Sequence, residues 1–139
     1  MLFLVPTLHA LDITVGSSFK ITKVVRTGGK IELPAQRNKY YDIRILNKET
    51  FDFVQSCTEP CVQPLENIVP IVSEARPAKT REDMWIVPVH FNRAWCITFL
   101  AFKRGEDVSI KSPSDFAFLN SALATKTRSL ILQAIKENK

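Results

Sequence analysis

The stretch Met84–Phe102, with the sequence MWIVPVHFNRAWCITFLAF, is the densest apolar run of the chain and contains both tryptophans. We interpret it as two β-strands joined by a tight turn at Asn92 and Arg93. Successive side chains of a strand point to opposite faces, and the second of these strands is apolar on both faces. It should therefore lie inside the fold, with a further layer of sheet on one face and the C-terminal amphipathic segment on the other.

The first strand of this pair has one strongly apolar face, while the other face carries Pro88 and His90. Proline has no N–H to donate to a neighbouring strand, which places Pro88 at a sheet edge or at a bulge. The large apolar side chains of both strands, together with those of a C-terminal helix, should form the core. The expected core residues are Trp85, Trp95, Phe99, Leu100, Phe102, Leu130, Ile131 and Ile135.

Short alternating segments fill the first half of the chain at a spacing of about ten residues, separated by turn residues. The expected strands are Asp12–Val15, Phe19–Arg26, Ile31–Leu33, Tyr40–Leu46 and Thr50–Val54. In Phe19–Arg26, strict alternation puts Lys23 on the same face as Phe19 and Ile21. Asn47, Lys48 and Glu49 are expected to form a tight turn before the last of these strands. The pattern is typical of an antiparallel β-sandwich or barrel.

Prolines interrupt this pattern between residues 57 and 83. A strand is expected within Asn67–Val72. The following segment, Ala75–Asp83, is polar and charged, which predicts a mobile surface loop. This loop and the edge at Pro88 are the surfaces that we expect to contact a partner. The residues expected on that interaction surface are Arg76, Lys79, Arg81 and Pro88.

The hydrophobic period changes near the C-terminus. Ser112–Asp115 has the composition of a helix start, and apolar residues then recur at spacings of three, four and seven. This pattern predicts an amphipathic helix at about residues 115–137 that packs on the sheet. We therefore expect a mainly β, α+β fold: a single β-sandwich-like or barrel-like domain over residues 11–139 with a C-terminal helix.

Residues 1–10 are largely apolar and end in His9-Ala10, which resembles a signal peptide or its truncated remnant although the positive first region is missing. The alternative is an N-terminal β-strand. Nothing else approaches the run of about 20 apolar residues that spans a bilayer, so we do not expect a membrane-spanning protein. The export signal predicts a periplasmic or secreted protein.

The sequence Cys57-Thr-Glu-Pro-Cys61 predicts a disulfide in an oxidising compartment. A more specific alternative is a redox-active or Cu(I)-binding pair. Soft thiolates bind Cu(I), and His90 would be the third ligand. The spacing is similar to that of thioredoxin-like copper chaperones, but the βαβ order of that fold is missing. Two free thiols in a cytosolic protein are the third interpretation. Cys96 lies mid-strand and is expected to be a buried thiol.

No motif of an enzyme is present: there is no Gly-Xaa-Ser-Xaa-Gly, no phosphate-binding glycine loop and no paired metal-ligand spacing. We therefore favour a non-enzymatic, exported interaction or structural module of the bacterial cell envelope, without a cofactor. Its partners would be other envelope proteins, as in a subunit of a secretion or conjugation assembly.

A nucleic-acid-binding β domain is the remaining alternative. The net charge of +5, from 19 basic and 14 acidic residues, permits such contacts without favouring them. Basic residues gather in the first half, near Tyr40 and Tyr41, which could stack on bases. The basic residues in question are Lys20, Lys23, Arg26, Lys30, Arg37, Lys39 and Arg44.

Overall fold

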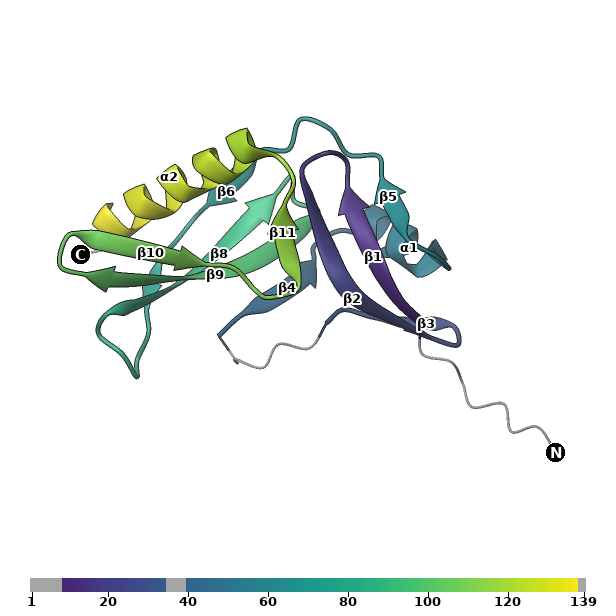
Figure 1. Cartoon of the computed structure of the whole chain (residues 1–139), viewed down its shortest axis with the longest axis horizontal. Helices are drawn as coiled ribbons and strands as arrows, with labels where there is room; N and C mark the ends of the chain where they lie inside the picture. The colour runs from purple at the N-terminus through teal and green to yellow at the C-terminus, as the bar shows by residue number, and fades with distance from the viewer. Residues whose placement is uncertain (1–8, 35–39, 138–139) are drawn as a thin grey trace.

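The computed structural model describes residues 9–34 and 40–137 (Figure 1). The strands are β1 (His9–Val15), β2 (Phe19–Thr27), β3 (Lys30–Glu32), β4 (Asp42–Ile45), β5 (Cys61–Gln63), β6 (Pro70–Val72), β7 (Arg76–Pro77), β8 (Met84–Phe91), β9 (Trp95–Arg104), β10 (Asp107–Lys111) and β11 (Phe116–Phe118). The helices are α1 (Lys48–Ser56) and α2 (Ser121–Glu137). The expected mainly β class with a C-terminal helix on the sheet is thereby confirmed.

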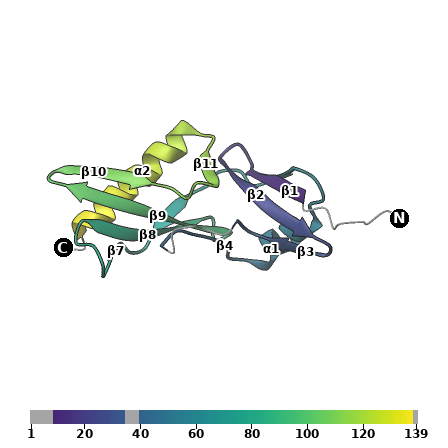
Figure 2. The same cartoon turned by 60° about the horizontal axis from the view of Figure 1, so that its bottom comes forward.

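Two sheets make up the described part of the chain. Sheet A has the strand order β11-β2-β1-β5, with β3 also paired to β2. Sheet B has the order β10-β9-β8-β6, with β4 also paired to β9 and β7 to β8. All pairs are antiparallel except that of β1 with β5. Figures 1 and 2 show α2 lying along sheet B, while α1 sits beside sheet A.

The hairpin of β8 and β9 forms as the sequence predicts. Its register runs from Met84 opposite Phe102 to Phe91 opposite Trp95. Asn92 and Arg93 both have φ of 53°, the left-handed backbone that a tight hairpin turn requires. The far side of β9 pairs with β4 in its first half and β10 in its second half. Because it is flanked along its whole length, β9 is buried from residue 95 to residue 101.

The two faces of β9 belong to different core clusters. Trp95, Ile97 and Phe99 pack in the main core together with buried residues of sheet A and α2. On the opposite face, Leu100 packs with Ala78 and Met84, and half-buried Tyr40 and Tyr41 join this smaller cluster. Sheet A and α2 therefore contribute to the same core on this side of sheet B, where α2 contacts β6, β8 and β11. The other face of β9 is covered by a loop, not by the separate layer that the sequence led us to expect.

The segment expected to be a strand at Thr50–Val54 is instead part of helix α1. The Oδ1 atom of Asn47 accepts the N–H of Thr50 at 2.8 Å, which makes Asn47 the helix cap. Thr50 and Val54, four residues apart, form the buried side of the helix. The alternation of Phe51 and Phe53 was misleading, because Phe51 is exposed to solvent.

The C-terminal helix begins at Ser121, not near residue 115, because residues 116–118 form β11 on sheet A. Phe116 and Phe118 pack against Phe99, with ring centroids 5.6 Å and 6.0 Å away, and this burial favours the strand. Asn120 is the cap, since its Oδ1 accepts the N–H of Leu123 at 3.1 Å. The buried stripe of α2 is Leu123, Thr127, Ile131, Ala134 and Ile135.

A β-bulge in β2 corrects the alternation predicted there. Thr22 and Lys23 face the single residue Asp12, and Lys23 has φ of 57°. The extra residue exposes Lys23 and returns Val24 to the core. The amide of Thr22 donates to the carbonyl of Asp115 at 2.8 Å, just before β11 joins the sheet.

The segment Ala75–Asp83 lies at the surface as its composition predicts, with Arg76, Lys79 and Arg81 exposed, but two of its residues anchor it to the sheet. Ala75 and Ala78 are buried, and β7 pairs with Ile86 and Trp85 of β8. Since β8 is flanked by β9 on one side and by β6 and β7 on the other, it is not an edge strand. Pro88 lies opposite the gap between β6 and β7, so its missing N–H breaks no pairing with either strand.

Most of the predicted core is buried. Trp95, Phe99, Leu100, Ile131 and Ile135 are at most 4% exposed, while Trp85, Phe102 and Leu130 are half-buried. The predicted export signal lies almost entirely outside the described residues. Ala10, the last residue of that segment, belongs to β1 and pairs with Val25 of β2. Among the described residues, no helix has the length and apolarity to cross a bilayer.

Candidate functional site

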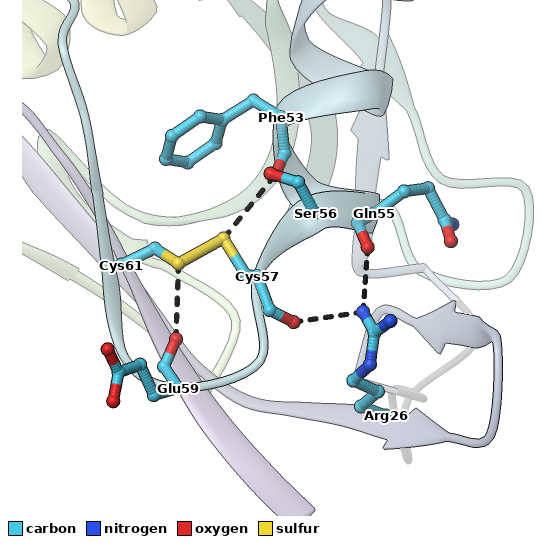
Figure 3. Close-up of a disulfide and its surroundings, with 7 residues drawn as sticks. All are labelled: Arg26, Phe53, Gln55, Ser56, Cys57, Glu59 and Cys61. Carbon is cyan, nitrogen blue, oxygen red and sulfur yellow. Dashed lines mark hydrogen bonds between the residues drawn. A yellow bond between two sulfur atoms is a disulfide. The ribbon is translucent and has the colours of Figure 1, made fainter.

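The predicted disulfide is present and closes one corner of the fold (Figure 3). Cys57 is the C-cap residue of α1, and Cys61 is the first residue of β5, with Cα atoms 6.1 Å apart. The bond ties the end of the helix to an edge strand of sheet A. Cys57 is buried and Cys61 is half-buried.

Arg26 of β2 holds the same helix end from below (Figure 3). Its Nη1 atom donates to the carbonyl of Gln55 at 2.7 Å and to that of Cys57 at 2.9 Å. The last turn of α1 contains no basic residue of its own, so the positive charge that favours a helix C-terminus comes from the sheet. Sequence reasoning placed Arg26 in a basic cluster and missed this capping role.

The surroundings of the two sulfur atoms favour a structural bond over a redox-active one. Sγ of Cys57 lies 3.4 Å from the carbonyl oxygen of Phe53, and Sγ of Cys61 lies 3.1 Å from that of Glu59. Carbonyl oxygens and the negative end of a helix both disfavour a thiolate, whereas reactive cysteines are typically found at helix N-termini. This geometry does not activate the pair.

The structure does not assemble the proposed copper site. Within residues 9–34 and 40–137, no group of three His, Cys, Asp or Glu side chains is placed to hold a metal ion. His90 lies on β8, opposite Ile71 of β6 and Cys96 of β9.

We expect the disulfide to contribute about 2 kcal/mol to the free energy of unfolding, because it closes only a short loop. The double variant Cys57→Ser/Cys61→Ser should melt about 6–8 °C below the wild type. Reducing the wild-type protein should lower its Tm by the same amount, which circular dichroism with and without reductant will measure. If the reduced protein melts like the oxidised one, the bond does not stabilise this corner.

A buried polar relay joins α1, β5 and β9 behind the disulfide. The indole Nε1 of Trp95 donates to Oε1 of Gln63 at 2.8 Å, and Nε2 of Gln63 donates to Oγ1 of Thr50 at 3.1 Å. Trp95, Gln63 and Thr50 are all at most 5% exposed. Asn47, which caps α1, extends the relay by donating to the carbonyl of Arg93 in the hairpin turn at 3.1 Å. Nothing in the sequence marks Gln63 as special.

The free thiol Cys96 is buried, as predicted. Burial raises the pKa of this thiol, and the guanidinium of Arg44, whose Nη2 lies 3.9 Å from Sγ, lowers it in part. The thiol is therefore protonated and enclosed at neutral pH, which makes it unreactive.

Three residues of the basic cluster in the first half make contacts within the fold. Beside Arg26, Arg44 forms an ion pair with Asp42 at 2.8 Å, and Lys23 lies 3.8 Å from Asp115. Arg37 and Lys39 lie outside the described residues. The nucleic-acid interpretation stays an untested alternative.

The predicted interaction residues gather on the outer face of sheet B, which we define as the face carrying Ile86, Pro88, Leu100 and Phe102. The loop of residues 78–84 crosses this face and packs on Leu100 through Ala78. A depression of about 350 Å³ lies on one side of the loop, lined by Tyr40, Arg76, Pro77, Lys79, Thr80 and Ile86. A second, of about 400 Å³, is lined by Arg81, Phe102, Arg104, Asp107, Ser109 and Lys111.

Three of the four predicted residues therefore line these depressions. Arg76 pairs with Glu74 at 3.5 Å, and Arg81 pairs with Asp83 at 2.8 Å, while Lys79 is exposed and has no ion-pair partner among the described residues. Pro88 lies on the same face without lining either depression. Sequence reasoning missed Phe102, Arg104, Ser109 and Lys111, because their meeting depends on the pairing of β9 with β10.

The guanidinium of Arg81 holds the pKa of the Asp83 carboxyl below its usual 3.8 by a hydrogen-bonded ion pair, aided by the charge of Arg104. Asp83 should therefore titrate below 3.8 in a carboxyl NMR titration. Its stabilising contribution is present above that pH and disappears as the pH falls through the folded-state pKa. Arg81→Ala should return the midpoint to the usual range, whereas Lys79→Ala should not move it. An unshifted midpoint in the wild type would contradict the ion pair.

Comparison with known proteins yields no match to a protein-family model, a curated protein or a solved structure.

Proposed function

We propose that this chain is a non-enzymatic, exported interaction module of the bacterial cell envelope that works as a subunit of a larger protein assembly. The observation that carries the proposal is the outer face of sheet B. It presents two depressions with partly apolar floors and cationic borders, separated by a loop that packs on the sheet. Binding surfaces of proteins combine such an apolar centre with a charged rim.

The loop between the depressions is tied to the sheet by hydrogen bonds, and ordering a binding surface in advance lowers the entropic cost of binding. The amide of Ala78 donates to the carbonyl of Met84 at 2.9 Å, and the amide of Lys103 donates to that of Asp83 at 2.8 Å. The hydroxyls of Tyr40 and Thr80 lie 2.7 Å apart, which ties the loop to the segment before β4. A partner would therefore meet a surface that is already formed.

The disulfide supports the compartment in this proposal, because such bonds persist in oxidising compartments and are rare in the cytosol. The test is thiol trapping in the native host: cells are quenched in acid, and the denatured protein is labelled with a maleimide of known mass. An exported protein should carry a single label, on Cys96. Reduction before labelling should add labels at Cys57 and Cys61. Three labels without reduction would place the chain in a reducing compartment and overturn the export proposal.

The assembly is tested by the native size of the protein in detergent extracts of the envelope. The wild-type protein should migrate well above its 15.8 kDa monomer mass. Arg76→Glu/Lys79→Glu should release it to monomer size, because both residues line the same depression. Lys30→Glu/Lys126→Glu, an equal charge change at exposed positions outside both depressions, should leave the complex intact. A monomeric wild type, or a complex that all variants retain, would contradict the proposal.

A further inference from the structure

The depression at Phe102 has an ordered arrangement of charges that follows from strand pairing. Ser109 lies opposite Phe102, while Arg104 and Lys111 are placed one row to either side on the same face. The paired strands thus put a hydroxyl between two cationic side chains, over an aromatic floor. All four residues line the same depression of about 400 Å³.

Arg81 forms a fixed wall of this depression. Its guanidinium carbon lies 5.2 Å from the centroid of the Phe102 ring, and Asp83 accepts from its Nε at 3.1 Å and its Nη2 at 2.8 Å. The ion pair and the aromatic ring together orient the guanidinium. Arg81 therefore shapes the wall of the depression, and its N–H groups that do not bond Asp83 remain as hydrogen-bond donors. Its guanidinium covers one face of the Phe102 ring.

The remaining charges of the lining leave a positive excess. Arg104 and Lys111 are exposed, and neither has an ion-pair partner among the described residues. Asp107, the only carboxylate in the lining, offsets part of this charge. Two unpaired cations and a hydroxyl donor form a site for an anionic oxygen group.

We propose that this depression binds a carboxylate-bearing, extended peptide segment of the partner protein. The inference rests on the proposed interaction function and names the chemistry that the face recognises. A peptide places separated carboxylates between uncharged groups, which suits two cations with Asp107 opposite Arg104 and Asp83 beside Arg81. A nucleic acid is the poorer fit, because these acidic groups repel a continuous row of phosphates and Arg81 covers the ring on which a base would stack.

The test is an NMR titration of the ¹⁵N-labelled protein with a capped peptide of Glu-Ser repeats. The peptide should produce saturable shifts at Phe102, Ser109 and Lys111 that weaken as salt is added. A Lys-Ser peptide and an oligothymidylate of equal length serve as probes of the opposite charge and of phosphate. Arg104→Glu/Lys111→Glu should reduce the affinity for the acidic peptide about tenfold, since it removes both cations.

Lys30→Glu/Lys126→Glu again serves as the matched control and should bind the acidic peptide like the wild type. Both double variants replace exposed side chains, and their melting curves will show that they fold. The proposal is overturned if the shifts do not saturate, if they map elsewhere, if both variants bind equally, or if the oligothymidylate binds this depression more tightly than the peptide.

The two proposals can fail separately. If the envelope complex forms but the acidic peptide does not bind at Phe102, the assembly function stands and this recognition chemistry is wrong. If the peptide binds at Phe102 but the native protein is a monomer, the depression retains its anion chemistry and the assembly proposal is wrong.

Discussion

Gln63→Leu should lower the free energy of unfolding by about 2–4 kcal/mol, although leucine is similar in size to glutamine. The variant removes the acceptor of the Trp95 indole N–H and the donor to Thr50, and all three residues are buried. A buried N–H without an acceptor has lost its hydration and gained nothing in return. Urea denaturation followed by tryptophan fluorescence will measure the loss, with an unchanged m-value expected.

Two further substitutions distinguish the effect of breaking the buried relay from the effect of replacing a glutamine by leucine. Thr50→Val removes only the last member of the relay, so it should cost about 1 kcal/mol, and its effect should not add fully to that of Gln63→Leu. Gln133→Leu is the matched control on the exposed side of α2, where the side chain bonds only Glu137, and should change stability by less than about 0.5 kcal/mol. A cost for Gln63→Leu as small as that of Gln133→Leu would contradict the relay.

Gly16→Ala should lower the free energy of unfolding by about 2–4 kcal/mol because two constraints act at one position. Gly16 has φ of +52°, and a Cβ there would lie 2.0 Å from the carbonyl oxygen of Leu65. That oxygen belongs to the backbone, which cannot move aside as a flexible side chain does. The amide of Gly16 also donates to the carbonyl of Gln63 at 2.9 Å, so the close approach is part of the contact between β1 and β5.

The other glycines provide a graded control. Gly28 has φ of +61° but open space around it, so Gly28→Ala should show the backbone cost alone, about 1 kcal/mol. Gly29 has neither constraint, and Gly29→Ala should be close to neutral. The expected order of destabilisation is position 16, then 28, then 29, measured by urea denaturation. Equal costs at positions 16 and 28 would show that the backbone near Leu65 yields to the added carbon.

Errors in reading the sequence arose where a local pattern had two solutions. Alternating Phe51 and Phe53 fits a strand, yet a cap at Asn47 and a buried Thr50 fit a helix, and a segment this short carries no period that separates them. The bulge at Lys23 likewise depends on the carbonyl of Asp115, with which neighbouring Thr22 makes a contact across 93 residues of sequence. The contact between Thr22 and Asp115 leaves no trace in the local pattern.

In the candidate site, too, some residues could be predicted from local composition and others depend on contacts between distant strands. Composition directed attention to Arg76, Lys79 and Arg81, and the structure places them along two depressions of one face. The partners that complete the second depression, Arg104 and Lys111, are brought together only by the pairing of β9 with β10. Composition also predicted a surface loop at residues 75–83, and the structure adds that buried Ala75 and Ala78 anchor it to the sheet.

The sequence alone determined the central hairpin, the disulfide partners, the C-terminal amphipathic helix and the burial of Cys96. Each depends on neighbours in the chain: the alternation of β8 and β9, the short spacing of Cys57 and Cys61, and the helical period of α2. The tertiary structure decided which element covers each face of β9, how Gln63 joins two buried partners, and how Arg26 caps α1. Those outcomes depend on contacts between distant segments, whose competition for the same surface is settled only when the chain folds.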